Sequence, residues 1–219
     1  MAVASVSAAD LSDRVISHVA EEELLRARLY GLLSRLLAAA PDAGLLAELK
    51  SAEGDSSELG MAFAALARAA ASTSAADTKS EYYDLFIGIG RGELVPYGSY
   101  YLTGFLHEKP LAELRTALAA LGIMRDSSVK EPEDHIAALC EVMGGLIDGA
   151  FGEPAPLPVQ RRLFERHIAP WAARFFADLE AAEAAAFYRV VGRIGRLFVG
   201  IETTAFAMVQ SDEFDGRAT

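Results

Sequence analysis

Apolar residues recur at spacings of three and four along most of the chain, which is the pattern of amphipathic helices. Between Asp10 and Ala40, leucines form one broad face while most charged residues fall elsewhere. Alternating β-branched runs, which would indicate strands, are nearly absent. The sequence therefore predicts an all-α fold, a single helical domain of about nine to eleven helices. Helices are expected over residues 10–40, 42–50, 61–70, 81–90, 110–121, 132–147, 159–168, 171–183 and 184–209.

Polar segments and segments rich in glycine and proline separate these helices. Residues 125–130 form a polar linker, which is the best candidate for a hinge between two subdomains. Residues 1–9 and 211–219 are expected to be flexible tails. The expected helical domain thus spans residues 10–210.

No targeting or membrane-spanning segment is predicted. The first basic residue is Arg14, so the amino-terminal residues lack the charged region of a secretory signal. The longest apolar stretch, residues 190–209, is interrupted by Arg193, Arg196 and Glu202. We therefore expect a cytoplasmic protein without stable membrane insertion.

Charge and composition narrow the function further. The chain has 219 residues and a net charge of -11, which disfavours nucleic acid as a partner because that binding needs a basic surface. Cys140 is the only cysteine and lies on an apolar helix face, so it is interpreted as a core residue rather than a nucleophile. The histidines are scattered and no Glu-x-x-His motif occurs, so neither a metal nor a cofactor is expected.

Two segments carry candidate chemistry. Glu131–His135 combines a proline with acidic residues, which suits the first turn of a helix and also suits recognition of a basic ligand. Residues 88–106 gather aromatic residues with few charges around Pro96, which suits either ordinary packing or a groove for an apolar peptide.

Together these segments resemble the TorD/DmsD family of redox-enzyme maturation chaperones. Four blocks occur in the family's order and spacing, within roughly a third of the chain. They are Glu81-Tyr82-Tyr83-Asp84-Leu85-Phe86 with Gly88 and Gly90, then Pro96-Tyr97-Gly98-Ser99-Tyr100-Tyr101-Leu102, then Leu111, Leu114, Arg115 and Leu121-Gly122, then Glu131-Pro132-Glu133-Asp134-His135-Ile136.

The resemblance implies a chaperone without catalytic turnover. Such proteins bind the twin-arginine signal peptide or the apo form of a molybdenum or tungsten oxidoreductase and delay export until cofactor insertion is complete. The client would be an apo-molybdoenzyme such as a formate dehydrogenase or a DMSO/TMAO-type reductase. The family's peptide-binding positions fall here on Leu85, Phe86, Pro96, Tyr97, Ser99, Asp134 and His135.

The chemistry of the residues agrees with this role. Carboxylates of Glu133 and Asp134 would pair with the planar guanidinium groups of two arginines. An uncharged groove at Leu85, Phe86, Pro96 and Tyr97 would accept the apolar stretch of the leader.

Two alternatives remain open. In the first, the client is recognised through its mature body rather than through its leader, and the chaperone acts in cofactor loading. A helical enzyme would instead use His135 and Asp134 as an acid–base pair. The sequence allows a monomer as well as a dimer that exchanges subdomains at the 125–130 linker.

Overall fold

The computed structural model describes the backbone of residues 8–126 and 129–215, and the side chains of residues 21–126 and 129–208. Over this part of the chain it contains ten α-helices, one π-helical turn and no strand, which confirms the predicted all-α fold. The elements are α1 Ala8–Ala38, α2 Ala43–Lys50, α3 Glu58–Ala71, α4 Ala75–Tyr82, the π-helical turn η1 Tyr83–Ile87, α5 Gly98–Thr103, α6 Lys109–Ala120, α7 Ile136–Asp148, α8 Leu157–His167, α9 Ala172–Ala181 and α10 Phe187–Asp215.

The expected tails and linker fall only partly on described residues. Residues 1–7, 127–128 and 216–219 lie outside them. Helix α1 already begins at Ala8, and α10 runs to Asp215. Among the helices that the structure describes, none is both long and apolar enough to cross a bilayer.

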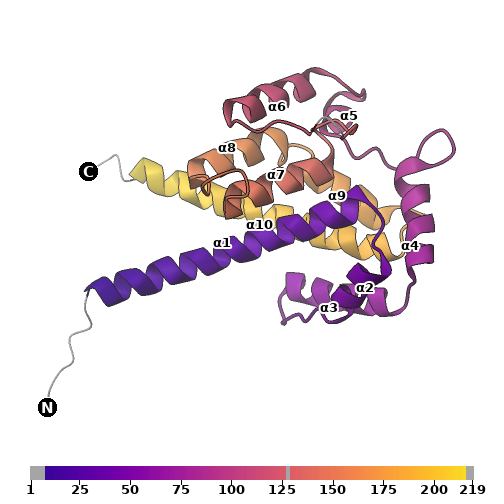
Figure 1. Cartoon of the computed structure of the whole chain (residues 1–219), viewed down its shortest axis with the longest axis horizontal. Helices are drawn as coiled ribbons and strands as arrows, with labels where there is room; N and C mark the ends of the chain where they lie inside the picture. Colours follow the sequence, from indigo (N-terminus) through magenta and orange to yellow (C-terminus); the bar gives the residue numbers. More distant parts are fainter. Residues whose placement is uncertain (1–7, 127–128, 216–219) are drawn as a thin grey trace, which may run out of the picture.

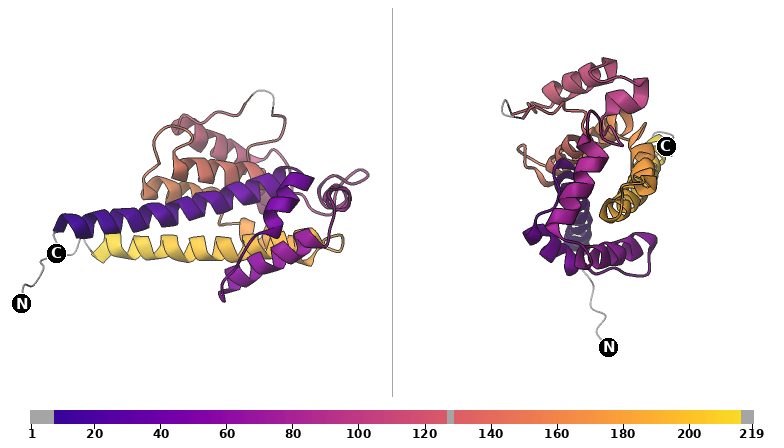
Figure 2. Two further views of the ribbon diagram at one scale, coloured as in Figure 1. Left: turned by 60° about the horizontal axis from the view of Figure 1, so that its bottom comes forward. Right: turned by 90° about the vertical axis from the view of Figure 1, so that its right-hand side faces the viewer.

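Two long antiparallel helices, α1 and α10, organise the molecule (Figure 1). The start of α1 and the end of α10 lie at the same end, and the short helices gather towards the other (Figure 2). Helix α7 packs along α1, while α9 and α3 pack against α10. Helices α2 and α3 lie on one side of this pair in Figure 1, and α5 and α6 lie on the opposite side.

Helix α7 forms the centre of the core. Ten of its thirteen residues are buried, as expected for a helix that is apolar on nearly all sides. Its Cys140 is fully enclosed, and burial raises the pKa of the thiol to about 12. The core position predicted for this cysteine is confirmed. On the α9 and α10 side, the core is aromatic, with Trp171, Phe175, Phe176 and Tyr188 at most 2% exposed.

The start of α10 is capped from a distant helix. The Glu81 carboxylate accepts hydrogen bonds from the backbone N–H groups of Ala186, Phe187 and Tyr188, at 2.7–3.1 Å. It satisfies donors that have no partner within the helix, and its charge favours the positive end of the helix dipole. The neighbouring Tyr82 hydroxyl donates to carbonyls at the end of α1. The first sequence block therefore joins the ends of both long helices.

Among the helix boundaries that differ from the sequence prediction, two fall in the recognised blocks. The helix expected from Pro132 begins at Ile136, because residues 132–135 form a turn in which the His135 N–H donates to the Pro132 carbonyl. The helix expected over 81–90 is divided between the end of α4 at Tyr82 and the π-helical turn, which ends at Ile87, just before Gly88. Gly88 has φ +61°, and a Cβ there would lie 2.1 Å from the Arg91 carbonyl oxygen. Only glycine suits that position.

A buried ion pair joins α1 to α10. Glu202 is 1% exposed and accepts hydrogen bonds from Arg26 Nε at 2.8 Å, Arg26 Nη2 at 2.7 Å and the Tyr30 hydroxyl at 2.9 Å. Burial alone would lower the pKa of Arg26, but the hydrogen bonds and charges of Glu202 and Glu23 raise it overall. Arg26 also contacts Gln160 of α8 at 3.2 Å, so three helices meet at one charge.

We expect Arg26→Met to lower the free energy of unfolding by about 3 kcal/mol, because Glu202 would be left buried without its cation. Urea denaturation followed by circular dichroism measures this change. Replacing both residues, as in Arg26→Met with Glu202→Met, should recover part of the loss. A double variant that is less stable than the single variant by a further 2 kcal/mol or so would contradict this account.

Candidate functional site

The second and fourth sequence blocks form one structural unit. The Gly98 N–H donates to the Asp134 carbonyl and the Ile136 N–H donates to the Pro96 carbonyl, each at 2.9 Å. These two bonds form an antiparallel bridge between Tyr97 and His135. Segments that lie far apart in sequence are thus fixed side by side.

The Asp134 side chain locks this unit from inside. It is 4% exposed, and its carboxylate accepts hydrogen bonds from the Ser99 backbone N–H at 2.8 Å and from the Ser99 hydroxyl. The role expected for Asp134 as a receiver of a ligand's arginine therefore does not fit, because its carboxylate faces the protein interior. Ser99 and Leu85, both 0% exposed, likewise lie behind the surface.

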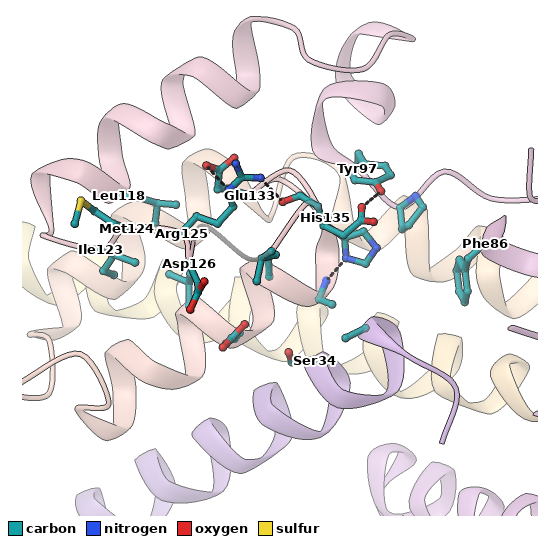
Figure 3. Close-up of a pocket in the computed structure, with 18 of the residues that line it drawn as sticks. Ser34, Phe86, Tyr97, Leu118, Ile123, Met124, Arg125, Asp126, Glu133 and His135 are labelled. Carbon is teal, nitrogen blue, oxygen red and sulfur yellow. Dashed lines mark hydrogen bonds and ion pairs between the residues drawn. The ribbon is translucent and has the colours of Figure 1, made fainter. Parts of the chain in front are cut away.

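The other five predicted site residues line one cavity of about 650 Å³ (Figure 3). They are Phe86, Pro96, Tyr97, Glu133 and His135. The walls come from the end of α1, from α4 and η1, from residues 123–126, Val129 and Glu131, and from α7. In Figure 3 Phe86 and Tyr97 lie towards one end of the cavity, and Ile123 and Met124 lie towards the other.

Tyr97 and His135 form the polar edge of the cavity. Their rings pack edge to face with centroids 5.0 Å apart, and the Tyr97 hydroxyl donates to the Glu131 carboxylate. Burial, together with the adjacent Glu131 charge, raises the pKa of Tyr97. This hydroxyl therefore stays protonated and donates a hydrogen bond at neutral pH.

His135 acts as a helix cap. Its Nδ1 accepts a hydrogen bond from the Ala137 N–H at 3.1 Å, at the start of α7. Burial lowers its pKa, and the charges of Glu131 and Asp134 offset this effect only in part. Within the described residues no hydrogen bond joins His135 to Asp134, so the acid–base pair considered from the sequence is not formed.

Two carboxylates on the cavity wall differ in whether they already have an ion-pair partner. Glu133 is paired with Arg115 at 2.8 Å and lies 3.7 Å from Arg125. Burial tends to raise the pKa of Glu133, but the hydrogen bond and charge of Arg115 bring it below its usual value. Glu141 is exposed and has no ion pair or hydrogen bond with any described residue. Of the two, Glu141 is the carboxylate open to a ligand.

An apolar surface continues from the cavity. A second hollow of about 490 Å³ shares Phe86, Ile87, Pro96 and Tyr97 with it. Its further lining includes Tyr100, Phe105 and Leu106, and Phe105 is 68% exposed. We call Ile87, Tyr100, Phe105 and Leu106 the apolar shelf. Of the described residues that line this hollow, Arg91 alone is charged, and its guanidinium lies 5.4 Å from the Tyr100 ring centre.

Several lining residues were not singled out from the sequence as site residues. Glu131 stood inside a recognised block but was assigned no role. Ser34 and Ala38 come from α1, and Ile123, Met124 and Glu141 carried no sequence signal of their own. Among the residues that the structure describes, no three His, Cys, Asp or Glu side chains gather closely enough to hold a metal ion.

A family comparison covers the part of the chain that builds this site. Residues 52–177 match the model of the family described as "Nitrate reductase delta subunit". The chain belongs to this family, which includes the TorD-type chaperones. The resemblance stated from the four blocks is confirmed, and all eight predicted site residues lie inside the matched range.

Curated relatives of this chain carry the name "Chaperone protein TorD". The name is that of a chaperone and not of an enzyme. The protein from Vibrio atlanticus is 25% identical over 139 residues, which is 60% of this chain and 65% of the relative. The one from Shewanella loihica is 26% identical over 207 residues, which is 82% of this chain and 92% of the relative. The matches to the first relatives, from Vibrio atlanticus and Vibrio cholerae, span 65% and 58% of their lengths.

A solved structure shares the family member's fold. It is described as a putative redox enzyme maturation protein from Archaeoglobus fulgidus, and it is 20% identical with a TM-score of 0.51. The similarity covers 80% of this chain and 93% of the other. At this identity the likeness concerns the helical fold alone.

Removing the Asp134 carboxylate should destabilise the fold. We expect Asp134→Ala to lower the free energy of unfolding by about 2–3 kcal/mol, because the two buried Ser99 donors lose their acceptor. Ser99→Ala, which removes only the hydroxyl donor, should cost about 1 kcal/mol. Urea denaturation measures both changes. Asp84 is exposed, so Asp84→Ala serves as the control and should change the free energy of unfolding by no more than about 0.5 kcal/mol. An Asp134→Ala variant as stable as the control would refute the structural role.

Burial of neutral His135 should make the fold sensitive to acid. Its pKa is lower in the folded than in the unfolded chain, so the unfolded state binds more protons as the pH falls through about 6.5. We therefore expect stability to decrease from pH 7 to pH 5, and His135→Asn, which keeps a side-chain acceptor for the Ala137 N–H, to show a shallower decrease. Thermal unfolding of both proteins across this range tests it, and identical slopes would count against it.

Proposed function

We propose that this family member is a cytoplasmic redox-enzyme maturation chaperone that binds the twin-arginine leader of a molybdenum or tungsten oxidoreductase. It would retain the apoenzyme until cofactor insertion and folding are complete. The observation that supports the proposal is that an acidic cavity and a mainly apolar hollow share part of their walls. A twin-arginine leader has the matching order, two cations followed by an apolar stretch.

The cavity supplies acceptors for guanidinium groups. Glu141 is exposed on α7 and has no partner among the described residues. Of the described residues, Tyr97 alone donates a hydrogen bond to the Glu131 carboxylate. A carboxylate accepts two parallel hydrogen bonds from an arginine, in a geometry that lysine does not reproduce. We assign arginine recognition to Glu131 and Glu141, in place of Asp134 and the already paired Glu133.

The apolar shelf supplies the second half of the site. Ile87 is 54% exposed and Leu106 is 44% exposed, so this surface removes apolar area from water when an apolar segment covers it. Phe86, Pro96 and Tyr97 lie between the cavity and the shelf. An extended leader would therefore place its arginines in the cavity and its apolar stretch on the shelf. Ordering of the leader limits the affinity to roughly micromolar.

The internal pairing of Asp134 and Glu133 favours a second candidate. Two acidic residues of the fourth block are already occupied, which weakens the case for recognition of an arginine pair. In that case the client is a molybdoenzyme subunit recognised through its mature body, and the chaperone acts in cofactor loading.

Calorimetric titration with leaders of the molybdoenzymes from the same genome tests the proposal, each beside a version with both arginines replaced by alanine. We expect one leader to bind and its substituted form to bind at least about tenfold more weakly. Glu131→Gln with Glu141→Gln should weaken the native leader to a similar degree and leave the substituted leader unchanged.

Glu53→Gln with Glu153→Gln is the matched control, because both carboxylates are exposed and line no part of the cavity. If the control weakens binding equally, the effect is one of net charge and the assigned site is wrong. If no leader binds, while the apoenzyme binds equally well with and without its leader, the second candidate is correct.

A further inference from the structure

A separate groove lies between α6 and α8. It is on the other side of α6 from the 650 Å³ cavity, which we call the leader cavity. Helix α6 gives Leu118 to the leader cavity, whereas its Glu113, Thr116, Ala117 and Ala120 line the groove. These four groove positions follow the i, i+3, i+4, i+7 spacing of a single helix face. The groove has a volume of about 410 Å³, and Figure 1 shows the two helices that border it.

The α8 wall of the groove is basic and apolar. Val159, Arg162, Leu163 and Arg166 repeat the same helical spacing, and His167 completes the wall. Arg162 and Arg166 are exposed, and neither makes an ion pair or hydrogen bond with a described residue. Their side chains lie one turn apart on one face, so both guanidinium groups are available to the same ligand.

This wall contrasts with the rest of the molecule. The chain carries a net charge of -11, and three arginines elsewhere, Arg26, Arg115 and Arg196, are paired with Glu202, Glu133 and Glu180. The one carboxylate in the groove, Glu113, pairs with Lys109 at 3.4 Å. Burial lowers the pKa of His167, the Arg166 charge adds to this effect, and the Glu113 charge opposes it.

We propose that the α6–α8 groove binds an acidic, partly apolar segment of the client's mature polypeptide. The floor of Ala117, Ala120, Val159 and Leu163 suits small apolar side chains, and the two arginines suit carboxylates one helical turn apart. The exposed guanidinium groups and the open, two-helix shape fit a peptide better than a small anion, which requires convergent buried donors. The inference rests on the proposed chaperone function but not on the leader cavity.

Overlapping peptides that cover the mature sequences of the molybdoenzymes from the same genome provide the test. We expect segments with two acidic residues at i, i+4 spacing next to apolar residues to bind. Arg162→Glu with Arg166→Glu should weaken them at least about tenfold, and exchanging the segment's acidic residues for lysine should restore binding to this variant. Leader affinity should stay unchanged in the same variant.

Arg68→Glu with Arg193→Glu is the matched control, because both arginines are exposed and remote from the groove. If no segment binds, or if segments bind equally to the groove variant and the control, the inference is wrong. Binding of inorganic pyrophosphate with the same arginine dependence, without any segment, would make the groove a small-anion site instead. If segments bind to the wild-type protein and none of the leaders does, the leader proposal alone is refuted.

Discussion

The contact on which the site depends is the buried hydrogen bonding of Asp134 to Ser99. A carboxylate removed from water requires strong donors, and the Ser99 N–H and hydroxyl supply both from a segment 35 residues away. Because Asp134 is held, the adjoining backbone bonds fix Pro96, Tyr97 and His135 at one edge of the cavity. The shape of the binding surface thus follows from a residue that the surface does not expose.

Several residues of the recognised blocks build this frame. Glu81 caps α10 and Tyr82 satisfies the end of α1. Gly98 lies against the Trp171 indole, where a Cβ would come within 3.0 Å of Nε1. Few other residue types would satisfy these positions, because each needs either a specific hydrogen-bonding group or a side chain no larger than that of glycine. Carboxylates at the open wall, such as Glu141, are under no such packing requirement, and our proposal assigns ligand recognition to them.

Helical periodicity predicted the fold well because apolar stripes such as that of α7 lie directly in the core. It failed where a tertiary contact decides the local structure. Pro132 and its acidic neighbours have the composition of a helix start, yet Asp134 turns inward to Ser99 and the helix begins at Ile136. The contribution of Ser34 from α1 arises only from tertiary packing, so no local pattern reveals it.

Placement of the two candidate surfaces on opposite sides of α6 has a consequence for binding strength. If both proposals hold, a client held by its leader in the cavity would present its mature body to the α6–α8 groove at an effective concentration of about millimolar. Two weak contacts would then give a high combined affinity, while each alone would release quickly. A client that buries the acidic segment as it folds would lose the second contact. The leader would then be held only by an affinity of roughly micromolar, so completion of folding would itself favour release.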